Sequence, residues 1–123
     1  MKGKDIKERT AELASRVLKL SDDLPGSYNI QVLSHQIVRS ATSVGANYRA
    51  ACRSKSRKDF INKLKTVEEE LDETIYWLGL ISDSKTVSAE RIRPLIDETT
   101  ELLAIIVKSI LTAKQNEKLN PKT

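Results

Sequence analysis

The most constraining feature of this sequence is an apolar repeat that advances in steps of three and four residues through four long segments. Such steps place side chains on one face of an α-helix, whereas a half-buried strand alternates every second residue. The four segments are Asp5 to Leu20, Tyr28 to Cys52, the residues after Ser56 to about Ser82, and the residues that follow Ser88. The repeat therefore predicts an all-α protein with four amphipathic helices.

Short polar links separate these segments and determine the topology. The first link contains Pro25 and Gly26, which both interrupt helices. Because short links force consecutive long helices to run antiparallel, we expect an up-down-up-down four-helix bundle. The length of the chain fits one domain over residues 1–123, with a tail that frays from about Gln115.

The helix starts and the apolar stripes specify this bundle further. Ser56 and Ser88 are suited to cap the third and fourth helices, and Asp59 is placed to reach back to the first amides of the third helix. The residues expected to form the core are Ile6, Leu13, Val17 and Leu20; Ile30, Leu33, Ile37, Ala41, Val44, Tyr48 and Ala51; Phe60, Leu64, Val67, Leu71, Thr74 and Leu78; and Ile92, Leu95, Ile96, Leu102, Leu103, Ile106 and Ile110.

The composition agrees with such a bundle and indicates a compartment. Aromatic residues make up only 4% of the chain, so the core must be largely aliphatic. The single cysteine, Cys52, cannot form an internal disulfide, which favours a reducing compartment. The N-terminal residues do not resemble a signal peptide, and the longest apolar run, Leu102 to Val107, is far shorter than the roughly 20 residues that span a bilayer. We therefore expect a cytoplasmic protein without membrane contact.

Two segments are too apolar for a single buried stripe. In Leu102 to Val107 and in Tyr76 to Ile81, apolar residues occupy most of the helix circumference. A helix that is apolar on all sides is buried on more than one side, so self-association is the simplest explanation. The alternative is a scatter of surface apolar residues, which folded proteins commonly have. The residues expected at an oligomer interface are Tyr76, Trp77, Leu80 and Ile105.

The second helix also contains many small residues around Gly45. Glycine costs about 1 kcal/mol relative to alanine in a helix interior, so its presence suggests a close helix contact. The partner could lie within the bundle or in a neighbouring subunit.

Charge is segregated along the chain, whose net charge is +4. Five basic residues surround the link between the second and third helices: Arg49, Arg53, Lys55, Arg57 and Lys58. Only Asp59 opposes them, and acidic residues dominate from 68 to 73. A basic rim at one end of a bundle suits a phosphate backbone, so these five residues are candidates for nucleic-acid binding. The alternative is a solvated face with intrahelical ion pairs such as Lys65 with Glu69.

A polar set lies beside the apolar stripe of the second helix. Arg39, Ser43 and Asn47 follow one another in steps of four residues and share one helix face. We expect Arg39 to pair with Glu69 or Glu73 on the third helix, an ion pair that would fix the register of the bundle. The residues assigned to this structural polar network are Arg39, Asn47, Asp59, Glu69 and Glu73.

Patterns for catalysis and metal binding are weak. Three pairs of carboxylates stand at i,i+3 spacing: Glu69 and Asp72, Glu70 and Glu73, and Glu98 and Glu101. Such pairs hold magnesium in all-α nucleotide pyrophosphatases, which leaves that activity as an alternative. A di-iron site needs Glu-x-x-His, but Val32 precedes His35 at that spacing. His35 and Cys52 lie about 25 Å apart along the helix, which is too far for a Cys–His nucleophile within one chain. We expect a protein without enzymatic activity, metal or cofactor.

The stretch from about Gln36 to Leu80 resembles a known family. The matching residues are Gln36-Ile37-x-Arg39-Ser40-Ala41-x-Ser43, Asn47, Ser56-x-x-Asp59-Phe60, and Glu69 to Trp77-Leu78. This pattern is similar to that of the bacterial four-helix bundle proteins named for open reading frames in intervening sequences of 23S ribosomal RNA genes. The acidic residue that often follows the asparagine in that family is absent here, since Arg49 and two alanines follow Tyr48. This departure makes the region more basic.

The resemblance implies a closed ring of bundles, typically a homopentamer. It also implies kinship with the accessory variability determinant of diversity-generating retroelements, a basic pentameric barrel that binds nucleic acid and a reverse transcriptase. Arg39, Asn47, Asp59, Glu69 and Trp77 correspond to the family's signature positions, for which we expect architectural roles.

The sequence thus favours a ring-forming, nucleic-acid-associated accessory or scaffold. The expected partners are further copies of the chain, RNA or DNA, and a reverse-transcriptase-like or other protein. The alternative is a protein-binding scaffold that does not bind nucleic acid and whose basic end is incidental.

Overall fold

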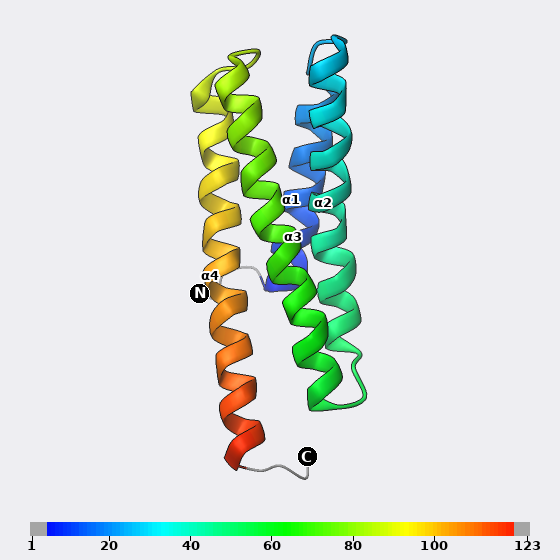
Figure 1. Ribbon diagram of the computed structural model, residues 1–123, viewed down its shortest axis with the longest axis vertical. Coiled ribbons are helices and arrows are strands. Elements are labelled where there is room, and N and C mark those ends of the chain that lie inside the picture. Colours follow the sequence, from blue (N-terminus) through cyan, green and yellow to red (C-terminus); the bar gives the residue numbers. More distant parts are fainter. Residues whose placement is uncertain (1–4, 120–123) are drawn as a thin grey trace.

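The computed structural model describes residues 5–119, which form four α-helices and no strand. The helices are α1 (Ile6–Asp22), α2 (Tyr28–Cys52), α3 (Arg57–Ser84) and α4 (Ala89–Leu119). Figure 1 shows that successive helices run in opposite directions and pack side by side as an up-and-down bundle. The predicted all-α four-helix architecture is confirmed. None of the helices in this range is long and apolar enough to cross a membrane.

Contacts between distant segments confirm the antiparallel arrangement. Arg9, near the start of α1, contacts Glu98 on α4, and Asp23, just after α1, contacts Arg91 on α4. Residue numbers therefore rise along α1 as they fall along α4.

Side-chain caps begin two of the helices as the sequence predicts. The Ser56 hydroxyl accepts a hydrogen bond from the Asp59 amide at 3.0 Å, and the Ser88 hydroxyl accepts one from the Arg91 amide at 3.3 Å. Each cap satisfies an amide that has no partner within its helix. The Asp59 carboxylate accepts a hydrogen bond from the Lys63 ammonium at 2.8 Å, so it pairs one turn forward along α3.

The buried side chains form one contiguous core, which is almost entirely aliphatic. The largest fully buried side chains are Leu13, Val17, Leu20, Ile37, Val44, Leu64, Leu71, Leu78, Ile81, Ile92, Leu102 and Ile106. Six residues that were expected in the core are only partly buried and pack against its edge: Ile6, Leu33, Tyr48, Phe60, Ile96 and Leu103. Ile61 and Ser34, the sequence neighbours of Phe60 and Leu33, are buried instead. Neighbouring positions differ by about 100° around a helix, so a small rotation of the buried face exchanges them.

The small residues of α2 serve a contact inside the bundle. A Cβ atom on Gly45 would lie 3.4 Å from the Thr10 hydroxyl oxygen on α1. Thr10 is itself buried, at 1% exposure. The close helix contact predicted at Gly45 is therefore made by α1 of the same chain.

The helices differ in length, which makes the two ends of the bundle unequal. α1 has 17 residues and α4 has 31, so α1 accompanies only part of α4. In Figure 1, α1 flanks α2 near their shared turn, while α4 continues past the start of α1 toward the α2–α3 turn. α4 remains helical through Leu119, four residues beyond the predicted start of fraying at Gln115.

Candidate nucleic-acid interface

The five predicted nucleic-acid-binding residues lie together around the α2–α3 turn, and they are called the basic end below. They are Arg49 in the last turn of α2, Arg53 and Lys55 in the turn, and Arg57 and Lys58 in the first turn of α3. All are exposed except Arg57, which is partly buried. Figure 1 shows this turn at the end of the bundle opposite the α1–α2 turn.

Backbone hydrogen bonds and a side-chain cap order the turn that carries these side chains. The amides of Arg53 and Ser54 donate to the carbonyls of Ala50 and Ala51 at 3.1 and 3.0 Å, which closes the last turn of α2. Ser56 then caps α3. The N-terminus of α3 carries a partial positive charge and favours anions, so the helix itself adds to the basic field.

The acidic residue nearest in sequence to the basic end is already paired. Asp59 is the only acid between residues 49 and 67. Its carboxylate accepts a hydrogen bond from Lys63, and this bond lowers the pKa of Asp59. Within residues 5–119 no ion pair engages the other four exposed cations, Arg49, Arg53, Lys55 and Lys58. These side chains are available to an external anion.

Aromatic side chains contribute little to this surface. Tyr48 lies on the inner side of α2. Burial is the main cause that raises the pKa of its phenol to about 12, and the neighbouring Cys52 is the second cause. Phe60 is partly buried against the core. Two aromatic residues of the described chain are exposed, and both lie away from the basic end. Tyr28 is in the first turn of α2, and Tyr76 is in the second half of α3. The basic end therefore suits contacts with phosphates rather than stacking on bases.

The last turns of α4 add cations that the sequence interpretation missed. Lys114 lines a pocket with Lys58, and Lys118 occupies the last turn of the helix. Lys114 lies just before the predicted start of fraying at Gln115, and Lys118 lies beyond it. The sequence signal for a continuing helix was Ala113, which extends the apolar repeat three residues past Ile110 and is buried.

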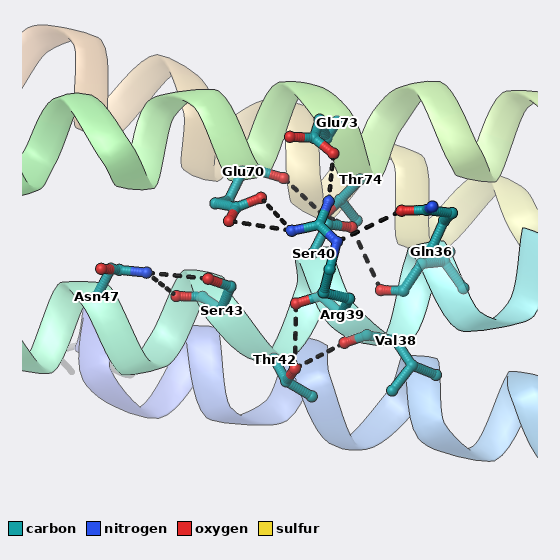
Figure 2. Close-up of polar contacts among 11 residues, drawn as sticks. Gln36, Val38, Arg39, Ser40, Thr42, Ser43, Asn47, Glu70, Glu73 and Thr74 are labelled. Carbon is teal, nitrogen blue, oxygen red and sulfur yellow. Dashed lines mark hydrogen bonds and ion pairs between the residues drawn. The ribbon is translucent and has the colours of Figure 1, made fainter.

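The predicted polar network is divided into separate contacts. Figure 2 shows Arg39 between Glu70 and Glu73 of α3. One guanidinium nitrogen of Arg39 lies 3.3 Å from Glu70, another hydrogen-bonds Glu73, and the third donates to Gln36. The predicted pairing with Glu73 is confirmed, whereas Glu69 is not a partner. Glu70 and Glu73 stand one turn apart on the side of α3 that faces α2, while Glu69 is rotated about 100° from Glu70.

Asn47 and Asp59 belong to different contacts from Arg39. The Asn47 amide donates to the Ser43 carbonyl and hydroxyl oxygens, both at 2.9 Å, within α2 (Figure 2). Asp59 pairs with Lys63 within α3. These bonds connect turns of one helix, so the single network assigned from the sequence is wrong.

Buried hydroxyl groups connect α2 to α3 beneath Arg39. The Thr74 hydroxyl lies 2.9 Å from that of Ser40 and donates to the Glu70 carbonyl at 2.8 Å (Figure 2). Thr74 and Ser40 are both fully buried. Buried hydroxyl groups need such partners, so this contact helps to align the two helices.

A second ion-pair cluster, which was not predicted, joins α1 to α4. The guanidinium of Arg9 donates to both carboxylate oxygens of Glu98 at 3.0 and 2.7 Å, and it also contacts Glu101 at 3.1 Å. The hydrogen bond from Arg9 lowers the pKa of Glu98, and the same bond raises the pKa of Arg9.

Two of the three carboxylate pairs considered for magnesium are occupied by arginines. Glu70 and Glu73 bind Arg39, and Glu98 and Glu101 bind Arg9. No group of three or more His, Cys, Asp or Glu side chains in residues 5–119 is placed to hold a metal ion.

His35 and Cys52, the two unique residues considered for catalysis, are both exposed on α2.

The four predicted interface residues lie on two surfaces. Tyr76 is 59% exposed on α3, and its ring packs edge-on against that of Trp77 at 4.9 Å between centroids. Trp77 and Leu80 are partly buried. Ile105 lines a separate groove with Phe60 at the start of α3.

Residues 2–108 match the family model described as 23S rRNA-intervening sequence protein. The chain belongs to this family. The match covers α1 to α3 and α4 as far as Lys108, which includes every residue of the basic end. Lys114 and Lys118 lie beyond the matched range.

A solved structure agrees with this membership in the 23S rRNA-intervening sequence protein family. It is the 1.70 Å crystal structure of a protein of unknown function from the S23 ribosomal protein family of Bacteroides thetaiotaomicron VPI-5482. The two chains are 36% identical and superpose with a TM-score of 0.80, over 86% of this chain and 98% of the other. No curated protein matches the chain.

Proposed function

We propose that this protein is a non-enzymatic, ring-forming accessory or scaffold that binds nucleic acid through the basic end. The observation that carries the proposal is the grouping of Arg49, Arg53, Lys55 and Lys58 without ion-pair partners in residues 5–119, beside an acid already paired with Lys63. Membership in a family of 23S rRNA-intervening sequence proteins supports a role near RNA.

The chemistry of the basic end implies how it binds. Arginine and lysine neutralise phosphates and release condensed counterions, so affinity falls steeply as salt rises. Because exposed aromatic side chains are absent from the basic end among the described residues, base identity has little influence. We expect weak preference among sequences and similar binding of RNA and DNA single strands.

Assembly into a ring strengthens such binding. A ring repeats the basic end once per subunit, and several weak contacts then add through multivalency. The exposed ring of Tyr76 and the groove that contains Ile105 are the surfaces proposed to contact neighbouring subunits. A homopentamer, the form implied by the family resemblance, is the proposed state in the cytoplasm.

Light scattering tests the assembly independently of nucleic acid. The wild-type chain should have the mass of a pentamer at micromolar concentrations, and Leu80→Glu or Ile105→Glu should lower it. A monomer mass for the wild type would contradict the ring. An unchanged mass for both variants would place the interface on another face.

A double charge reversal tests the basic end. Arg53→Glu with Lys55→Glu should abolish retention of a single-stranded oligonucleotide in filter binding, because both residues lie in the exposed turn between the helices. Arg93→Glu with Lys19→Glu is the matched control, since it changes net charge equally at exposed sites outside the basic end. If the wild type retains neither RNA nor DNA at low salt, the protein-binding scaffold becomes the better description.

A further inference from the structure

A small pocket lies beside the basic end, on the outer surface between α3 and α4. Its volume is about 320 Å³, and its lining residues are Lys58, Ile61, Asn62, Lys65, Lys114 and Glu117. Lys58 belongs to the basic end, so the pocket adjoins the proposed nucleic-acid surface.

Helix geometry explains how these residues meet. Lys58, Asn62 and Lys65 follow one another in steps of four and three residues, which places them on one face of α3. Ile61 beneath them is 5% exposed and anchors that part of α3 to the core. Lys114 comes from the antiparallel α4, next to buried Ala113. The pocket is therefore formed by two rigid helices rather than by a loop.

The charges of the pocket are unbalanced. Lys58, Lys65 and Lys114 take part in no ion pair within residues 5–119, whereas Lys63 on another face of α3 is paired with Asp59. Three lysines and a single carboxylate, that of Glu117, thus line the pocket, while Lys65 also borders the acidic groove described below. An anion would relieve the repulsion among the lysines, and the Asn62 amide can donate a further hydrogen bond.

The neighbouring groove has the opposite charge and limits the site. It is lined by Lys65, Glu68, Glu69 and Asp72 of α3, with Leu103 and Val107 of α4. The sign of the charge therefore reverses within about one helical turn after Lys65. A polyanion that enters from the basic end would be repelled beyond Lys65, so the pocket forms the end of the binding surface.

We propose that Lys58, Asn62, Lys65 and Lys114 bind one phosphate group. This proposal rests on the proposed function, because the natural source of the phosphate group is a nucleic-acid backbone that crosses the basic end. A free phosphate ion carries the same chemistry, and the experiment distinguishes the two sources.

Charge reversal on α4 tests the pocket, with a control on the same helix. Lys114→Glu should weaken binding of a single-stranded oligonucleotide about tenfold at moderate salt and lower the slope of log affinity against log salt by about 1. Arg93→Glu is the matched control: Arg93 is likewise an exposed cation of α4, but it lies outside this pocket, the basic end and the groove that contains Ile105. It should leave affinity within about twofold of the wild type.

The outcomes separate this inference from the proposed function. If Arg53→Glu with Lys55→Glu abolishes binding but Lys114→Glu matches Arg93→Glu, the pocket is not part of the interface and the inference is wrong. If the wild type binds no oligonucleotide, the proposed function fails, and titration with inorganic phosphate decides the pocket alone. Shifts of the Asn62 side-chain amide signals that disappear in Lys114→Glu would then support a site for free phosphate. No shift would overturn the site altogether.

Discussion

The α2–α3 interface and the α1–α4 interface within the bundle, called seams below, are held together by different interactions. Between α2 and α3, buried Ser40 and Thr74 hydrogen-bond among aliphatic side chains, and the Arg39 ion pairs lie outside this contact. Between α1 and α4, the partly buried Arg9 binds two glutamates. The first seam depends mainly on burial, and the second depends more on charge.

We infer from this difference that the α2–α3 hairpin and α1 have different roles. The α2–α3 hairpin carries the basic end and, on α3, four of the six residues that line the proposed phosphate pocket. Its rigidity therefore positions the proposed ligand. α1 is shorter and is fastened to α4 by ion pairs, whose strength varies with pH and salt. We expect α1 to be the first helix to open, which makes the difference between the seams measurable.

Truncation of a core leucine in each seam should have the largest effect. Leu71→Ala in α3 and Leu13→Ala in α1 should each cost about 3 kcal/mol, because both side chains are fully buried. Hydrogen exchange should distinguish them. Leu13→Ala should accelerate exchange in α1 while α2 and α3 stay protected, whereas Leu71→Ala should accelerate exchange in all four helices. Equal acceleration of all helices by both variants would contradict an α1 that opens separately.

Removal of Arg9 should have the next largest effect. Arg9→Ala should destabilise the protein by about 2 kcal/mol in urea unfolding, since it leaves Glu98 partly buried without its partner. Glu98→Gln with Arg9→Met is the control, because the double variant removes both charges. It should recover part of the loss, and a double variant no more stable than Arg9→Ala would contradict this explanation.

Acid should weaken the α1–α4 seam by a smaller amount. The hydrogen bond from Arg9 lowers the pKa of Glu98 in the folded protein, so its contribution is fully present above the unfolded value of about 4.3. It is lost as the pH falls through the lowered folded value. Between about pH 5 and pH 2, the wild type should lose on the order of 1 kcal/mol more than Glu98→Gln does. Parallel stability curves for the two proteins would contradict this assignment.

Removal of Arg39 should have the smallest effect. Its side chain is 50% exposed, so water and salt screen its interactions with Glu70 and Glu73. Arg39→Ala should cost only about 0.5 kcal/mol, and 0.5 M salt should erase most of that cost. A loss as large as that of Arg9→Ala would show that the α2–α3 seam also depends on charge.

The fold was predictable because its main signals are local. The bounds of α2, Tyr28–Cys52, agree with the prediction, and Ser56 and Ser88 cap the helices expected of them. The basic end was also predictable, since its residues are near neighbours around one turn. The prediction failed at the C-terminus, where α4 stays helical through Leu119 instead of fraying from Gln115.

The four helices, their alternating directions, the aliphatic core and the position of the basic end all follow from the order of the amino acids. The packing of the helices was needed to find that Arg39 binds Glu70 rather than Glu69, that Arg9 reaches Glu98, and that Lys114 joins Lys58. Apolar periodicity is a property of one helix and can be read from consecutive residues. Contacts between helices depend on the axial register and rotation of segments far apart in the chain, and a shift of one residue turns a side chain by about 100°.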